Sequence, residues 1–218
     1  MPRKKNTSPT VTETDVPTQI KNPDLVRQKR RHIIDSTVKL FIDHGYHKTT
    51  TRMIAKAANF SIGSLYEYVS SKEDLLYLVC QSIHEEVRAA VEKAMESPGE
   101  GLEKLSAAIR QYFYVCDKMT DHILLMYQVT QFLPDKWKDR ILTSELDITR
   151  IFITTLTSLS ENGAIPRMDQ KTLDLVGDNI SVLGQMWAFR RWHVQKNFDL
   201  ENYIDIQTRF ILGQILGS

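Results

Sequence analysis

TTTRMIAKAANFSIGSLYEYVSSKEDL, the stretch Thr49–Leu75, holds two short helix-like segments separated by a turn and followed by a longer helix. Thr50, Ser61 and Ser71 are good N-cap residues, and each predicts the start of one of these three helices. Asn59 lies between the first two, and asparagine tolerates the left-handed backbone that such a turn requires. The stretch therefore predicts a helix-turn-helix unit.

The composition is that of an ordinary globular protein. The chain has 218 residues, of which 42% are hydrophobic and 25% are charged, enough for one or two domains with a core. No apolar run approaches the roughly eighteen residues that a membrane span needs, and no secretory signal is recognised. Two cysteines, Cys80 and Cys116, suit a reducing compartment. We expect a cytoplasmic protein without membrane contact.

The charge is unevenly divided along the chain. Residues 1–72 contain 13 Lys and Arg against 6 Asp and Glu, a net charge of +7, whereas the remainder contains 15 against 21, a net charge of −6. This asymmetry predicts that only the first third meets a polyanion such as nucleic acid.

The organisation that we expect is all-α, with about nine helices. Residues 1–23 are polar and rich in Pro and Thr, which predicts a disordered basic arm. Residues 24–70 form the predicted helix-turn-helix DNA-binding domain. Residues 71–218 form a second predicted helical domain, which begins with a connecting helix over residues 71–96. Apolar residues recur every three or four positions from residue 24 onward, and strand-like alternation is absent.

The outward side chains of the opening stretch suit DNA. A recognition helix enters the major groove by its N-terminal end, which directs Ser61, Ile62 and Ser64 toward base edges. Hydroxyl, ammonium and free backbone N–H groups nearby suit phosphate oxygens. The alternative makes the tyrosines half-buried core residues and the charges solvated. The predicted DNA-binding residues are Thr50, Thr51, Arg52, Ser61, Ile62, Gly63, Ser64, Tyr66, Tyr68 and Lys72.

The order of these residues resembles the N-terminal domain of the TetR family of bacterial transcriptional repressors. Asn59 and Val69 replace the glycine and phenylalanine usual in that family. The matching positions are Gly45-Tyr46, Thr49-Thr50, Ile54-Ala55, Ser61, Gly63, Tyr66, Tyr68, Lys72-Glu73 and Leu75.

The resemblance implies a homodimer that binds a double-stranded, inverted-repeat operator, and it makes residues 71–218 the effector-binding and dimerisation domain. Its two recognition helices would lie about 34 Å apart, one turn of DNA. Dimerisation in the family comes mainly from the last two helices, and the sequence supplies apolar and small residues there. The predicted interface residues are Ile180, Leu183, Gly184, Phe210, Ile211 and Ile215.

The resemblance also implies a small hydrophobic effector, bound among the middle helices. The segment Trp187–Leu216 loosely resembles relatives that sense fatty acyl-CoA thioesters, which would make the protein a lipid-metabolism repressor whose long connecting helix tilts on binding. Arg190, Arg191 or His193 would then meet the nucleotide phosphates. The alternative is a repressor of an efflux pump that responds to a planar or cationic drug, although no buried carboxylate stands out. The predicted effector-binding residues are Tyr112, Met119, Met126, Tyr127, Phe132, Phe152, Trp187, Arg190 and Arg191.

Three rival functions account for less of the sequence. A small all-α enzyme is the distant alternative, but no nucleophile motif or phosphate loop is present, and we expect no catalytic residue and no cofactor. His44 and His47 lack a third ligand, so no metal site is expected. A redox sensor would depend on Cys80 and Cys116, which lie on predicted inward faces. A purely structural helical scaffold would leave the Thr49–Leu75 pattern unexplained.

Overall fold

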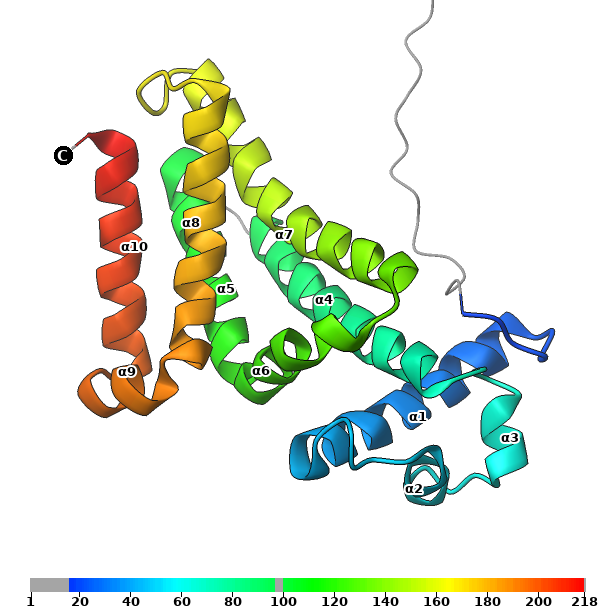
Figure 1. Ribbon diagram of the computed structural model, residues 1–218. Helices are drawn as coiled ribbons and strands as arrows, with labels where there is room; N and C mark the ends of the chain where they lie inside the picture. Colours follow the sequence, from blue (N-terminus) through cyan, green and yellow to red (C-terminus); the bar gives the residue numbers. More distant parts are fainter. Residues whose placement is uncertain (1–15, 97–99, 218) are drawn as a thin grey trace, which may run out of the picture. The chain divides into compact units, whose positions relative to one another are not determined.

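The computed structural model describes residues 16–96 and 100–217 of the chain. Within these ranges the regular structure is helical, without a strand (Figure 1). The chain divides into two compact units, residues 1–78 and residues 79–218, and the division falls inside one long helix. In the same ranges no helix is both long and apolar enough to cross a membrane.

The N-terminal unit contains α1 (Pro23–His44), α2 (Thr51–Ala57), α3 (Ile62–Tyr66) and the first residues of α4 (Lys72–Met95). The Asn22 side chain accepts the first backbone N–H groups of α1, and Gly45 ends this helix at a φ of 78°. Such a positive φ favours glycine, which explains why the helix ends at this residue.

The turn between α2 and α3 has the predicted geometry. Asn59 adopts a φ of 57°, the left-handed conformation that the sequence predicts. Ile54, Ala55, Ala58 and Leu65 are at most 2% exposed, and they form the small core between α2 and α3. Small residues at the crossing let the two helices approach closely.

Residues 16–22 differ from the mobile arm predicted over residues 1–23. Val16 is buried, and its carbonyl oxygen accepts a hydrogen bond from Arg30 Nη2 at 2.7 Å. The Thr18 hydroxyl and the Gln19 amide both donate to the carbonyl oxygen of Glu67, each at 2.9 Å. The prediction is therefore corrected for this segment, because hydrogen bonds to Arg30 and Glu67 hold it against the rest of the unit. Residues 1–15 of the predicted arm lie outside the described residues.

The C-terminal unit continues α4 from Val79 and adds a bundle of helices around α8, which contacts α5, α6, α7, α9 and α10. Figure 1 shows α8 between α7 and α10, with α5 behind it. The elements are α5 (Gly101–Lys118), α6 (Thr120–Val129), the 3₁₀ helix η1 (Thr130–Phe132), α7 (Asp135–Glu161), α8 (Gln170–Phe189), α9 (Arg191–Asn197) and α10 (Leu200–Leu216). The described residues thus hold ten α-helices, and the short α9 is the one that the sequence did not predict separately.

Two glycines explain how closely α8 approaches its neighbours. A Cβ atom added at Gly177 would lie 2.4 Å from the side chain of Ile153 on α7. A Cβ atom at Gly184 would lie 2.4 Å from the ring of Tyr112 on α5. Both distances are shorter than any real carbon contact, so these helix surfaces meet only because the side chains are absent.

This packing corrects most of the predicted dimer interface. Ile180, Gly184, Ile211 and Ile215 are buried inside the unit itself, so they are not available to a second chain. Leu183 is half-buried, and only Phe210 is largely exposed, at 56%. The helical period gave the apolar positions correctly but not which neighbour covers them. The larger apolar side chains left exposed on these helices are Leu175, Val182, Phe189, Ile206, Phe210 and Leu216.

Candidate nucleic-acid interface and internal cavity

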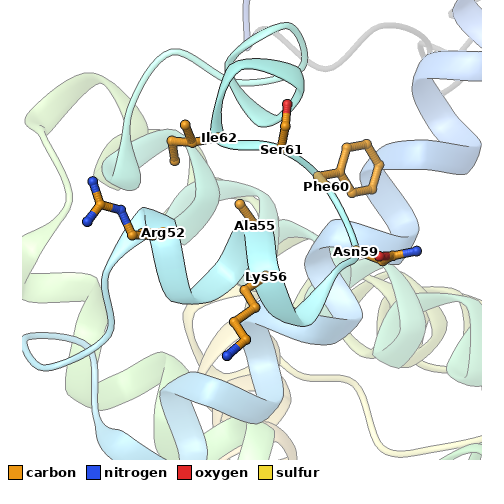
Figure 2. A pocket seen from close by; sticks show the side chains of 7 residues that line it. All are labelled: Arg52, Ala55, Lys56, Asn59, Phe60, Ser61 and Ile62. Carbon is orange, nitrogen blue, oxygen red and sulfur yellow. The ribbon is translucent and has the colours of Figure 1, made fainter.

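An open groove runs between α2 and the start of α3 in the N-terminal unit. Figure 2 shows Arg52 and Ile62 toward one end of the groove and Asn59 and Phe60 toward the other. Its volume is about 490 Å³, and its lining residues are Arg52, Ala55, Lys56, Asn59, Phe60, Ser61 and Ile62. Arg52 and Lys56 are exposed, so the groove offers two cations beside the polar start of α3.

Local hydrogen bonds hold the exposed start of α3. The Ser61 hydroxyl oxygen accepts from the Ser64 amide at 3.0 Å and donates to the Ser64 hydroxyl at 2.9 Å. This confirms Ser61 as the N-cap, and Thr50 caps α2 in the same way by accepting from the Met53 amide at 3.2 Å. Ser61, Ile62 and Gly63 remain exposed, whereas Ser64 is half-buried. The N-terminal end of α3 therefore presents polar groups to solvent.

Tyr66 and Thr51 connect the two short helices at this surface. The two hydroxyl oxygens lie 3.2 Å apart, and the Tyr66 side chain is 42% exposed. Thr50 is exposed and Thr51 is half-buried, so these three residues share the accessible side of α2 and α3.

Tyr68 differs from the prediction. Its side chain is only 6% exposed and packs edge-on against Phe60, with ring centroids 5.8 Å apart. Its carbonyl oxygen accepts from the buried Arg30. The prediction of a phosphate contact by the Tyr68 side chain is therefore corrected, and the alternative of a core aromatic holds for this residue.

Lys72 is the first residue of α4, and its side chain reaches Tyr46 in the loop that follows α1. Its ammonium donates to the carbonyl oxygen of Tyr46 at 2.5 Å and lies 4.1 Å from the centre of the Tyr46 ring. Partial burial lowers the pKa of Lys72, and nearby Glu73 opposes that change. The Tyr46 hydroxyl donates to Glu73 at 3.2 Å, and burial together with Glu73 raises the pKa of Tyr46 to about 12. Lys72 is thus held in place at the start of α4, where Ser71 caps the helix by accepting from the Asp74 amide.

Lys56 is the groove residue that the sequence analysis missed. It lies one helical turn after Arg52 on α2, and this spacing of four residues could have revealed it. Phe60 also lines the groove, and its side chain is half-buried.

A second, enclosed cavity lies within the C-terminal unit. Its volume is about 20 Å³, room for about one water molecule. Helices α4, α5, α6, α7 and α8 supply its lining: Ile83, His84, Val87, Tyr112, Cys116, Ile123, Met126, Glu145, Ile148, Thr149, Ser181 and Gln185. Of the predicted effector residues, Tyr112 and Met126 line it.

The other predicted effector residues lie elsewhere. Met119, Phe152 and Trp187 are buried in the surrounding core, and the Trp187 ring nitrogen donates to Asp117 at 2.7 Å. Phe132 is 38% exposed. Tyr127 does not line the cavity but reaches it through Glu145 and Gln185. The Arg190 guanidinium lies over the exposed Trp192 ring, and Arg191 pairs with Asp121 at 2.7 Å.

Hydrogen bonds connect the polar groups of the cavity lining with one another and with Tyr127. The Glu145 carboxylate accepts from the Tyr127 hydroxyl and from Gln185 Nε2, the latter at 3.3 Å. The Thr149 and Ser181 hydroxyl oxygens lie 2.8 Å apart, and the Tyr112 hydroxyl donates to the Ser181 carbonyl oxygen at 3.1 Å. Burial, and then Glu145, raise the pKa of Tyr127, so it remains a donor. Sequence reasoning missed His84, Glu145 and Gln185, because they are far apart along the chain.

Comparison with known proteins decides the family. Residues 33–78 match the model described as "Bacterial regulatory proteins, tetR family". The chain is also 26% identical over 186 residues to the HTH-type transcriptional regulator HbdR of Aromatoleum sp. (strain CIB), covering 85% of this chain and 80% of that protein. Residues 33–78 form a TetR-family domain.

Two further similar proteins cover different shares of the chain. The fatty acid metabolism regulator protein of Bacillus subtilis (strain 168) is 30% identical over 87 residues, covering 40% of this chain and 45% of that protein. The crystal structure of AibR in complex with isovaleryl coenzyme A and operator DNA matches with a TM-score of 0.67 and 16% identity, covering 86% of this chain and 98% of that chain. The second likeness establishes the fold alone.

Family membership also bears on the rival functions. The family consists of transcriptional regulators, not enzymes. Cys80 and Cys116 are both buried, and burial raises the pKa of each thiol to about 12. A thiol with so little thiolate reacts slowly with oxidants, which argues against a redox sensor. Across residues 16–96 and 100–217, no group of three or more His, Cys, Asp or Glu side chains is arranged to hold a metal.

Proposed function

We propose that the chain is a ligand-responsive transcriptional repressor that binds an inverted-repeat operator as a homodimer and is released by a hydrophobic effector. The observation that carries this proposal is the exposed groove of α2 and α3, where Arg52 and Lys56 flank the polar N-terminus of a short helix. This arrangement suits insertion into a major groove with phosphate contacts on both sides. The protein would act in the cytoplasm.

Exposed apolar residues on the last helices support a second copy of the chain as partner. Leu175, Val182 and Phe189 follow one another at intervals of seven residues on α8, and Ile206 and Phe210 lie one turn apart on α10. A stripe of this kind is typical of helix pairs that pack along their length. Soluble monomers seldom leave such a surface uncovered.

A fatty acyl-CoA thioester is the effector class that we favour. The apolar lining of the cavity suits an acyl chain, and exposed Arg190 and Arg191 would suit nucleotide phosphates. The fatty acid metabolism regulator and the isovaleryl coenzyme A complex among the similar proteins support this class. Since the cavity has room for about one water, the effector would have to push the lining helices apart.

Helix α4 contributes Ile83, His84 and Val87 to the cavity lining. The boundary between the two units falls within this same helix, between Leu78 and Val79. Expansion of the cavity would therefore displace α4 and change the spacing of the two recognition helices. The ligand must bind the released conformation more tightly than the DNA-binding conformation by several kcal/mol. A ligand with equal affinity for both conformations would not change their populations.

A drug-responsive repressor of an efflux pump is the second candidate. Glu145 favours it, because a carboxylate at the cavity beside Tyr112 is the kind of group that attracts a hydrophobic cation.

Salt titration of DNA binding tests the proposal. The full chain should bind duplex DNA from its own promoter region with an affinity that falls steeply as salt rises, because cations on the protein displace counterions. Arg52→Ala with Lys56→Ala should reduce the slope of log K against log salt by about 2, whereas Lys104→Ala with Lys171→Ala in the C-terminal unit should leave it unchanged. An affinity that does not depend on salt would contradict the proposal.

A further inference from the structure

The imidazole of His84 is a buried group without a partner. Its side chain is 4% exposed, and neither Nδ1 nor Nε2 has a hydrogen-bond partner in the described part of the chain. A neutral imidazole offers one donor and one acceptor. Buried polar groups are normally satisfied, so a group left open beside a cavity is a place where the polar atom of a bound molecule can form a hydrogen bond. Gln81 and Thr208 also carry an unpaired buried oxygen, but neither lines the cavity.

Glu145 brings a negative charge to the same cavity. Its hydrogen bonds come from the Tyr127 hydroxyl and the Gln185 amide, both uncharged donors. Lys and Arg ion pairs found in residues 16–96 and 100–217 involve other carboxylates. A ligand carboxylate placed here would meet a like charge in a poorly solvated site, which is strongly unfavourable.

Much of the remaining lining is apolar. Its apolar side chains include those of Ile83, Val87, Ile123, Met126 and Ile148. An effector with an apolar body would rest against them with its polar end at His84 and Glu145. The lining therefore offers both apolar contacts and a charged group to a bound molecule.

We propose that His84 and Glu145 act as a charge filter: the cavity accepts an apolar effector whose polar end is uncharged and hydrogen-bonds to His84, and it rejects a free carboxylate. This inference rests on the proposed function and deepens it. A regulator of this design responds to the carbonyl of an acyl thioester or amide, and it does not respond to the corresponding free acid.

Octanamide and octanoate test the filter, because they share one apolar body and differ in the charge of the end group. Calorimetric titration of the full chain near neutral pH should give a Kd for octanamide about tenfold or more below that for octanoate. Glu145→Gln should tighten octanoate binding and narrow the ratio to about threefold or less. The matched control is Glu161→Gln at the exposed end of the same helix, which should leave the ratio unchanged.

Two variants separate recognition by His84 from simple packing. His84→Phe should weaken octanamide binding about tenfold, whereas His84→Gln, which keeps a donor and an acceptor, should stay within about threefold of the parent. Equal weakening by both variants would make His84 a packing residue and overturn its role.

The proposal is also overturned if the unaltered chain binds octanoate as tightly as octanamide, or binds neither. The failure of the filter is distinguishable from the failure of the proposed function. Salt-dependent DNA binding without a preference for octanamide overturns the filter alone, whereas a preference for octanamide in a chain that binds no DNA overturns the repressor proposal alone.

Discussion

The groove of the N-terminal unit and the cavity of the C-terminal unit are assembled in different ways. The groove is built from residues 52–62, and its shape depends on hydrogen bonds between near neighbours such as Ser61 and Ser64. The cavity takes His84, Glu145 and Gln185 from three helices. Local hydrogen bonding therefore specifies the first site, and long-range packing specifies the second. Each prediction below challenges or sharpens this contrast.

The largest effect on stability is expected at Arg30, whose hydrogen bonds join residues of the N-terminal unit that are far apart in the sequence. Its guanidinium is 4% exposed and donates to the carbonyl oxygens of Val16 and Tyr68, 14 and 38 residues away. Arg30→Leu should lower the free energy of unfolding by about 2–4 kcal/mol, because buried acceptors lose a charged donor. Urea denaturation measures the change. Arg27→Leu, on the same helix but exposed, should change it by about 0.5 kcal/mol at most.

One substitution at two glycines should have opposite effects in the two units. Gly184→Ala places a carbon 2.4 Å from the buried Tyr112 ring, so it should destabilise the protein by about 1–3 kcal/mol. At Gly63 the nearest atom would be Ser61 Oγ at 3.8 Å, so Gly63→Ala should stabilise it by about 0.5–1 kcal/mol through helix propensity. Thermal unfolding of both variants checks the prediction, and a similar loss at both positions would contradict the close approach of α5 and α8.

A smaller effect is expected from acid. Burial lowers the pKa of His84 from its ordinary value of 6.5, and Glu145, the charged residue in the cavity lining, opposes this only in part. As the pH falls below 6.5, the unfolded chain binds a proton that the folded chain resists. The free energy of unfolding should therefore fall with the pH, by at most about 1.4 kcal/mol per pH unit.

His84→Phe should remove this part of the pH dependence and leave the rest. Urea denaturation of the two proteins at about pH 7.5 and about pH 5.5 gives the comparison. Identical pH dependence in both would show that the cavity does not hold His84 neutral.

The smallest effect, none within error, is expected from mild oxidation. Cys80 and Cys116 are fully buried, and burial keeps both thiols protonated. Treatment with a mild oxidant should leave the Kd for DNA unchanged, as measured by fluorescence anisotropy. A loss of affinity that a reductant restores would favour the redox sensor instead.

The sequence predicted the features that depend on near neighbours. The caps at Thr50, Ser61 and Ser71 and the left-handed Asn59 are confirmed, because each involves bonds or dihedral angles within a few residues. The all-helical fold followed from the spacing of apolar residues. These features suffice to position the exposed end of α3.

The features that the sequence did not predict depend on which surfaces meet. Tyr68 carries a hydroxyl group of the kind that binds phosphate, yet its side chain is buried and packs against Phe60. Gly184 suits close helix approach, but its neighbour is α5 of the same chain. Helical periodicity identifies an apolar face without identifying its partner, and for the same reason His84 and Glu145 could not be brought together from sequence.

Selection of bound sequences from a random duplex library tests the central claim, that the exposed end of α3 reads DNA, most directly. We predict that the unaltered chain enriches an inverted repeat with half-sites about one DNA turn apart. Ser64→Ala should change the preferred bases, whereas Tyr66→Phe should weaken binding to all sequences about equally. Failure to enrich any sequence, or identical preferences and affinities in all three proteins, would contradict the account.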